Sequence, residues 1–167
     1  MAAHSRRMAS VTSRRVDPPN NPNAPSYAAV LGECGIEHQA GVADTGVVGL
    51  IPGVADGPAV ALRADLDALP LDDAKQVPYR SQVPGKMHAC GHDAHTAVLL
   101  GAAGVLAGLK ENLPGTVVFL FQPAEEGPPE GEEGGARLMV AEGLLDDPKV
   151  EAVFGLHVGS WANAGEA

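Results

Sequence analysis

The chain has 167 residues, 45% of them hydrophobic, and a formal net charge of −10 at pH 7. This length and composition fit one globular domain with one hydrophobic core. The acidic charge argues against nucleic acid and anionic membranes as partners, and the sequence has no run of about 18 apolar residues that would span a membrane. Cys34 and Cys90 are its two cysteines, too few for a disulfide framework, so we expect a reducing, cytoplasmic location.

Residues 1–26 are rich first in Arg and Ser and then in Pro and Asn. Such a segment cannot bury enough apolar surface to offset the entropy of ordering, so we expect a disordered tail. It lacks the apolar segment of a secretory signal and only faintly resembles an organellar transit peptide. We therefore place the folded domain at residues 27–167, beginning with a short helix from residue 27 to residue 32 or 35.

Apolar segments with the composition of buried β-strands occur at residues 46–51, 59–64, 116–121 and 151–158. Small and apolar residues predict a helix over 94–110, and a second, shorter helix is expected over 136–142. Because strands and helices alternate, we expect an α/β domain with a largely parallel sheet flanked by helices. Two polar segments rich in Pro and Gly, 72–86 and 127–135, predict loops, and we expect the acidic second loop to be mobile.

Residues 86–96 concentrate side chains that bind metals or move protons: His88, Cys90, His92, Asp93 and His95. They lead into the predicted helix, where Asp93 can cap the first N–H groups and the helix dipole favours a thiolate at Cys90. Cys90 and His92 are two positions apart, which suits a tight turn facing one ion, and Gly91 lets the backbone bend between them. The alternative is an ordinary buried cysteine beside a capping aspartate.

Acidic and histidine side chains also follow the predicted strands, at Asp65, Asp67, Glu125, Glu126 and His157. Ligands bind beyond the carboxyl ends of the strands in open α/β sheets, so we expect these side chains to meet Cys90 and His92 at one edge. Each has a plain alternative. The aspartates could cap a turn, the glutamates could be a solvated pair, and His157 could be a hydrogen-bonded core histidine.

Cysteine, histidine and carboxylate together suit zinc, and histidine with carboxylate also suits manganese. Cys90, His92, His157 and one of Glu125 and Glu126 form a candidate ligand set. The other glutamate could then take a proton from a water that the metal activates. Such a site predicts hydrolysis of a polarised carbonyl group, most simply that of an amide.

Five motifs resemble the N-terminal half of the amidohydrolases in the aminoacylase/carboxypeptidase-like metallopeptidase family. They lie in the family's order at residues 61–70, 87–96, 121–127, 134–137 and 155–158. The most similar branch contains hippurate hydrolases, auxin-conjugate hydrolases and N-acetyldiaminopimelate deacetylases. The resemblance implies a zinc-peptidase-like catalytic domain that uses one or two Zn or Mn ions to hydrolyse N-acyl amino acids or similar small amide conjugates.

The same resemblance implies metal ligands at Cys90, His92, Glu126 and His157, with Glu125 as the general acid/base. Asp65, Asp67 and Asp93 would orient these groups or support the fold. The chain departs from the family in three ways. It has no helix with a His-Pro-Glu-like segment, and its loop at 127–135 is longer than usual. In the family, the lid and dimerisation domain, the rest of the catalytic domain and a final histidine ligand follow the last strand. We expect all of these to be absent from this chain, which ends at Ala167.

We therefore expect a truncated catalytic domain at 27–167, with its oligomeric state open. Two alternatives remain. One is a catalytically inactive remnant that at most binds metal or a partner. The other is a cysteine hydrolase that uses Cys90 and a histidine, although it leaves Glu125, Glu126 and His157 without a role.

Overall fold

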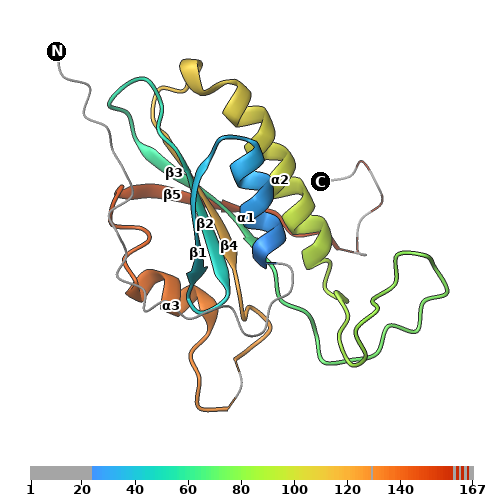
Figure 1. The fold of residues 1–167 in the computed structure, drawn as a ribbon. Coiled ribbons are helices and arrows are strands. Elements are labelled where there is room, and N and C mark those ends of the chain that lie inside the picture. The colour runs from blue at the N-terminus through green and yellow to red at the C-terminus, as the bar shows by residue number, and fades with distance from the viewer. Residues whose placement is uncertain (1–23, 129, 160, 162, 164, 166–167) are drawn as a thin grey trace.

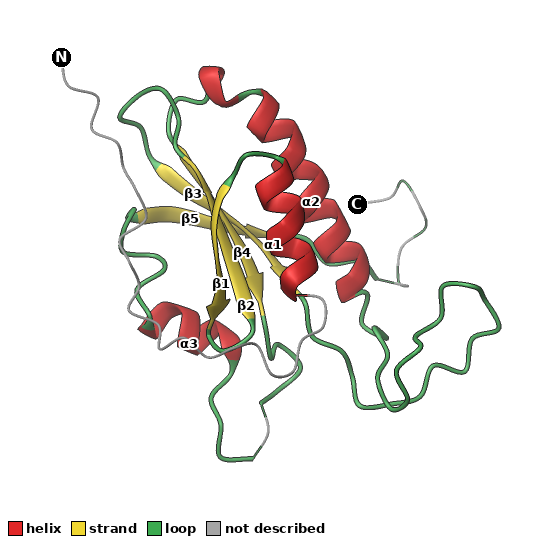
Figure 2. Ribbon diagram, in the orientation of Figure 1, coloured by secondary structure: helices red, strands yellow, loops and turns green. Residues whose placement is uncertain are grey.

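The computed structural model describes residues 24–128, 130–159, 161, 163 and 165. They form a five-stranded sheet in the order β1-β2-β4-β3-β5. Its strands are β1 (Glu37–Val42), β2 (Gly46–Ile51), β3 (Ala59–Asp65), β4 (Thr116–Gln122) and β5 (Val150–Gly155). The helices are α1 (Ala24–Glu33), α2 (His92–Gly108) and α3 (Gly135–Ala141), with a 3-10 turn η1 (Lys110–Asn112) after α2. Figures 1 and 2 show α1 and α2 together beside the sheet and α3 apart from them.

The predicted α/β class is confirmed, but the sheet is mixed rather than largely parallel. β3 is parallel to both of its neighbours, β4 and β5. β2 runs antiparallel to β4 and forms a hairpin with β1, a strand that the sequence did not predict. β1 is a partly exposed edge strand, so its apolar pattern is weak. β2 is buried along its whole length. An apolar strand sequence shows that layers cover both faces of the strand, but it does not show whether the strand is parallel or antiparallel to its neighbours.

Side chains of β4 alternate between the two faces of the sheet and build a core on each. Val117, Phe119 and Phe121 pack with residues of α1 and α2, whereas Val118 and Leu120 pack with residues of α3 and the segment after it. This alternation follows from the two-residue period of a strand. The helices therefore cover both faces of the central strands and hold the sheet's carboxyl-end edge in place.

The element boundaries differ from the predicted ones at several ends. α1 begins at Ala24, before the expected start at residue 27, and the rest of the predicted disordered tail lies outside the described residues. α2 begins at His92 rather than residue 94, after Gly91 with φ of 85°. β5 ends at Gly155, so His157 lies beyond the strand. The predicted loop at 72–86 is confirmed as free of helix and strand.

The carboxyl ends of the parallel strands and the start of α2 meet at one edge of the sheet. Asp65 at the end of β3 pairs in register with Gln122 at the end of β4. The chain segments that leave β3, β4 and β5 therefore emerge beside the first turn of α2. No helix among the described residues is long and apolar enough to cross a membrane.

Candidate metal centre

His92 lies in the first turn of α2 and its side chain is only 1% exposed. Its Nδ1 donates to the carbonyl oxygen of Asp67 at 2.9 Å, so in the neutral ring the lone pair is on Nε2. Nε2 is buried and has no hydrogen-bond partner among the described residues. A buried polar atom without a partner is unfavourable and calls for an explanation.

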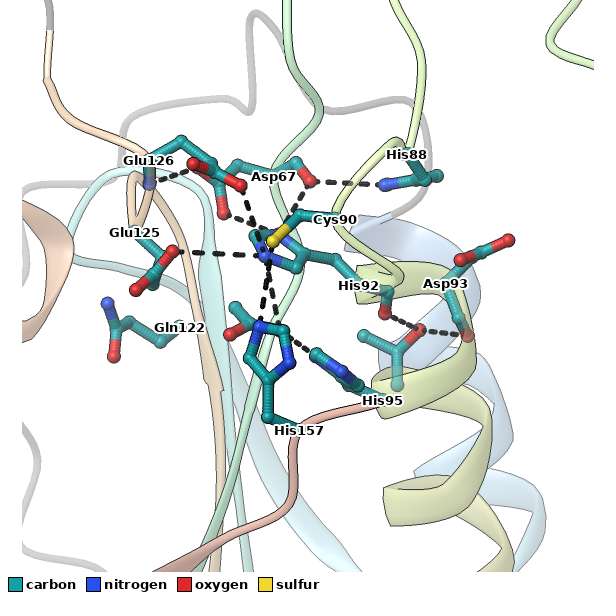
Figure 3. Close-up of polar contacts among 12 residues, drawn as sticks. Asp67, His88, Cys90, His92, Asp93, His95, Gln122, Glu125, Glu126 and His157 are labelled. Atoms are coloured by element: carbon teal, nitrogen blue, oxygen red, sulfur yellow. Dashed lines mark hydrogen bonds and ion pairs between the residues drawn. The ribbon is translucent and has the colours of Figure 1, made fainter. Parts of the chain in front are cut away.

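Three carboxylates surround this nitrogen. Nε2 of His92 lies 3.6 Å from Glu126, 3.7 Å from Asp65 and 3.8 Å from Glu125. Figure 3 shows Glu125, Glu126 and the sulfur of Cys90 pointing toward the ring. The unpartnered lone pair thus faces a group of negative side chains, an arrangement that a cation would satisfy.

Cys90, His92 and Glu126 have donor atoms that all lie within 4.8 Å of one another. Cys90 comes from the turn before α2, and Glu126 follows β4. The backbone N–H of Glu126 donates to Asp67 Oδ2 at 3.0 Å, which fixes it near His92. This compact set of sulfur, nitrogen and oxygen donors is typical of a site for a borderline-soft divalent ion such as zinc.

His157 approaches the same group from the segment after β5. Its Nδ1 lies 2.6 Å from the carbonyl oxygen of Val158, which leaves Nε2 as the lone-pair atom. That Nε2 lies 3.5 Å from Cys90 Sγ, and Figure 3 shows the ring directed at the cluster. The fold therefore brings all four of the side chains expected to be ligands to one place, with His157 on its exposed side.

The prediction that the helix dipole favours a thiolate at Cys90 is wrong for the protein without a cation. A hydrogen bond with Glu126, burial, and the charges of Glu126, Glu125 and Asp65 raise the pKa of the thiol to about 11. Carboxylates from other segments outweigh the start of α2. A divalent cation would reverse this balance, because it stabilises the thiolate and neutralises the surrounding carboxylates.

Glu125 differs from Glu126 in its position. Its side chain is 40% exposed, and it lies outside the group of three closely spaced donors. A backbone turn at Ala124, with φ of 48°, separates the pair from β4. Glu125 therefore lies at the edge of the cluster, in contact with both solvent and the donors.

Asp67 connects the predicted ligands, whereas Asp93 does not reach them. The backbone carbonyl oxygen of Asp67 accepts from His92 Nδ1 and lies 3.1 Å from His88 Nδ1. The side-chain carboxylate of Asp67 accepts from the backbone N–H of Glu126. Asp93 accepts from the N–H of Ala94 at 3.0 Å and points away from the cluster (Figure 3). It does bond an N–H of the first turn, as expected, but it lies inside the helix, after its N-terminal cap.

Asp65 and His95 form a second buried group with His92, but hydrogen bonds occupy both nitrogens of His95. Its Nδ1 lies 2.6 Å from Asp65 Oδ1 and its Nε2 accepts the N–H of Val158 at 2.9 Å. Burial alone would raise the pKa of Asp65, but the hydrogen bond with His95 and the charge of Arg63 lower it below the usual value.

The sequence analysis named His95 among the reactive side chains but gave it no role, and it gave none to Arg63. Two signals were available. Arg63 interrupts an otherwise apolar strand, and His95 is three positions after His92, which places both rings on the same side of α2. Their centroids are 5.6 Å apart.

The sequence model of peptidase family M20/M25/M40 matches residues 61–166. The chain is 52% identical over 130 residues to IAA-amino acid hydrolase ILR1-like 4 of Arabidopsis thaliana, covering 78% of this chain and 28% of that protein. It is 47% identical over 127 residues to N-acetyl-L-cysteine deacetylase of Bacillus subtilis, covering 76% of this chain and 29% of that protein.

Among solved structures, the fold resembles the YXEP protein of Bacillus subtilis, described as a dinuclear metal binding peptidase from the M20 family. The TM-score is 0.74 and the sequences are 42% identical, with 82% of this chain and 36% of that chain covered. The chain thus spans only 28–36% of the length of these three proteins.

Proposed function

Since this chain belongs to peptidase family M20/M25/M40, we propose that it is the metal-binding part of an amidohydrolase that cleaves N-acyl amino acids or similar small amide conjugates. The observation that carries this proposal is the buried, unpartnered Nε2 of His92 among three carboxylates. The names of two relatives, an IAA-amino acid hydrolase and an N-acetyl-L-cysteine deacetylase, support the substrate class. Residues 27–167 would then form part of a catalytic domain.

Cys90, His92, Glu126 and His157 would hold a zinc or manganese ion. Donor atoms of Cys90, His92 and Glu126 lie within 4.8 Å of one another, and His157 Nε2 lies 3.5 Å from the Cys90 sulfur. A bound divalent ion would supply Lewis-acid polarisation of the amide carbonyl and would acidify water at the site.

Glu125 would act as the general acid/base. Its carboxylate is near the ligands but partly in solvent, so it can accept a proton from water and pass it to the leaving amine. Asp67 would orient the reaction site, because it bonds the ring of His92 and the backbone of Glu126. The two adjacent glutamates can therefore have different roles, since only Glu126 belongs to the closely spaced donors.

A chimera tests this function. Residues 61–157 of this chain would replace the matching segment of Bacillus subtilis N-acetyl-L-cysteine deacetylase, and hydrolysis of a series of N-acetyl amino acids would be measured. We expect hydrolysis that stops on treatment with a chelator and returns with zinc or manganese. A chimera that folds and binds metal but hydrolyses nothing would favour the inactive remnant instead.

The same experiment separates the cysteine-hydrolase alternative. A nucleophilic cysteine needs a lowered pKa, whereas the carboxylates around Cys90 raise the pKa of its thiol to about 11. Hydrolysis by a cysteine nucleophile would continue after chelation and would stop on alkylation of the metal-free protein. We expect the reverse dependence on the chelator.

A further inference from the structure

A chain of buried and partly buried hydrogen bonds runs from the carboxyl ends of β3 and β4 to the segment that carries His157. Its central member is His95 in α2, whose side chain is 1% exposed. Nδ1 of His95 bonds Asp65 Oδ1 at 2.6 Å and Nε2 accepts the N–H of Val158 at 2.9 Å. With a carboxylate on one side and a donor on the other, the ring has one tautomer, Nδ1–H, and one orientation.

The Asp65 end of this chain is fixed by two strands. Arg63 donates from its guanidinium to Asp65 Oδ2 at 2.7 Å and from Nε to the side-chain oxygen of Gln122 at 2.8 Å. Arg63 and Asp65 belong to β3 and Gln122 to β4, which are paired in parallel. His95 is therefore held against the carboxyl ends of two paired strands rather than against a loop.

The Val158 end of this chain of hydrogen bonds lies beyond the last strand of the sheet. β5 ends at Gly155, and His157 and Val158 are both exposed. The ring of His157 stands edge-on to that of His95, with centroids 4.6 Å apart. Gly91 also meets this segment, because a Cβ added there would lie 2.4 Å from Val158 Cγ2. Contacts with the start of α2 therefore locate the residue next to His157.

We propose that His95 is a positioning residue that holds His157 at the metal centre through the backbone of Val158. This inference rests on the proposed function, which makes His157 a ligand. A ligand on an exposed segment must be ordered before it can bind, and a fixed partner lowers that cost. Partners that orient a metal ligand typically change metal affinity by about 10–100-fold when removed.

Two substitutions of His95 separate positioning from stability. In His95→Asn the amide occupies the place of Nδ1 and keeps a donor for Asp65, but it cannot reach Val158. In His95→Gln the amide oxygen occupies the place of Nε2 and can accept from Val158, while the bond to Asp65 is lost. We expect Asn to weaken zinc binding by about 10–100-fold with the smaller loss of thermal stability. His95→Gln should cause the smaller loss of zinc affinity and the larger loss of thermal stability. A purely structural role would make affinity follow stability.

The experiment is a zinc titration of the 167-residue chain, in competition with a chromophoric chelator. It compares wild type, His95→Asn, His95→Gln, His157→Ala and the double variant His95→Asn/His157→Ala. If His95 acts through His157, the double variant should bind zinc as weakly as His157→Ala alone. Additive losses, or wild-type affinity in His95→Asn, would overturn the positioning role. Wild-type affinity in His157→Ala would instead overturn the ligand set of the proposed function.

Amide hydrogen exchange of Val158 gives a second readout that does not depend on zinc or on the stability of a variant. The N–H of Val158 should exchange slowly in the wild-type chain because it donates to the buried Nε2 of His95. Exchange at the rate of an unstructured amide in the folded wild-type protein would contradict the inference, even if every His95 variant failed to fold.

Discussion

At the residue scale, the two ring nitrogens of His92 differ in their hydrogen bonding. Nδ1 is bonded to the Asp67 carbonyl oxygen at 2.9 Å, whereas Nε2 faces carboxylates of Glu126, Asp65 and Glu125 at 3.6–3.8 Å with no hydrogen bond. The first bond fixes the tautomer of the neutral ring, which places its lone pair on Nε2. A divalent cation is the partner that suits a lone pair and carboxylates together.

The two adjacent glutamates should respond differently to removal of their charge. In the chimera, Glu126→Gln should lower metal content, because it removes a charged donor from the group of three. Glu125→Gln should keep the metal and lose about 10²–10⁴-fold in hydrolysis, the usual contribution of a general acid/base. Metal content and rates would be measured for both, with Glu132→Gln as a control in the nearby loop. Loss of metal in Glu125→Gln alone would mean that the roles are swapped.

Residue chemistry alone predicted which side chains come together at the site, but it did not predict the protonation state of Cys90. Cys90, His92, Glu125, Glu126 and His157 could be selected because they follow strands or precede a helix, and the fold brings them together. The state of Cys90 could not be predicted, because it depends on how closely carboxylates from two other segments approach the sulfur. The role of His95 likewise depends on which partner meets each ring nitrogen.

At the element scale, the start of α2 depends on a glycine. Gly91 has φ of 85°, in the left-handed region, and a Cβ there would lie 2.4 Å from Val158 Cγ2. Gly85 has a similar φ of 69°, but a Cβ there would meet nothing within 4 Å in the described part of the chain. A substitution at either glycine would therefore place a side chain on a left-handed residue, but only a substitution at Gly91 would also collide with the segment that carries His157.

Alanine substitution at these glycines should separate strain from positioning. Gly85→Ala should cost about 1–2 kcal/mol of unfolding free energy, the price of a left-handed residue, and leave zinc affinity unchanged. Gly91→Ala should cost more and should also weaken zinc binding, because Val158 must move. Urea denaturation and zinc titration would measure the two effects. Equal zinc affinity in both variants would show that the contact with Val158 does not position the site.

The elements with a strong apolar pattern were predictable, and those without it were not. β2, β3 and β4 lie close to the predicted segments because buried strands need continuous apolar residues. β1 is a partly exposed edge strand, and its Glu-His-Gln start carries no such pattern. The pairing of β2 with β4 was also beyond the sequence, since an antiparallel strand covered on both faces has the composition of a parallel one.

At the scale of the whole molecule, β5 forms an edge of the sheet that the described elements leave uncovered. Leu62 of β3 pairs in register with Phe119 on one side and Phe154 on the other. Phe119 is fully buried, whereas Phe154 is 58% exposed. Val153 and Leu156 are exposed as well. An apolar strand with an unpaired edge is a site for association between chains.

We expect the 167-residue chain to self-associate through this edge. Phe154→Lys should shift it toward the monomer with little change in stability, because the side chain is largely in solvent. Val140→Lys, at a residue of α3 that is 56% exposed, should leave association unchanged. Sedimentation velocity would compare the three proteins. A shift with Val140→Lys alone would place the association surface on α3 instead.

Zinc titration of the purified chain tests the metal centre most directly, and the sequence supplies matched controls. Cys90→Ser and His92→Ala change proposed ligands, whereas Cys34→Ser and His38→Ala change the same residue types away from the site. We expect the two controls to bind zinc as the wild type does. The two ligand variants should lose at least about tenfold in affinity, since each removes a direct donor and loss of an orienting partner alone costs about that much. Equal affinity in all five proteins would contradict the metal centre.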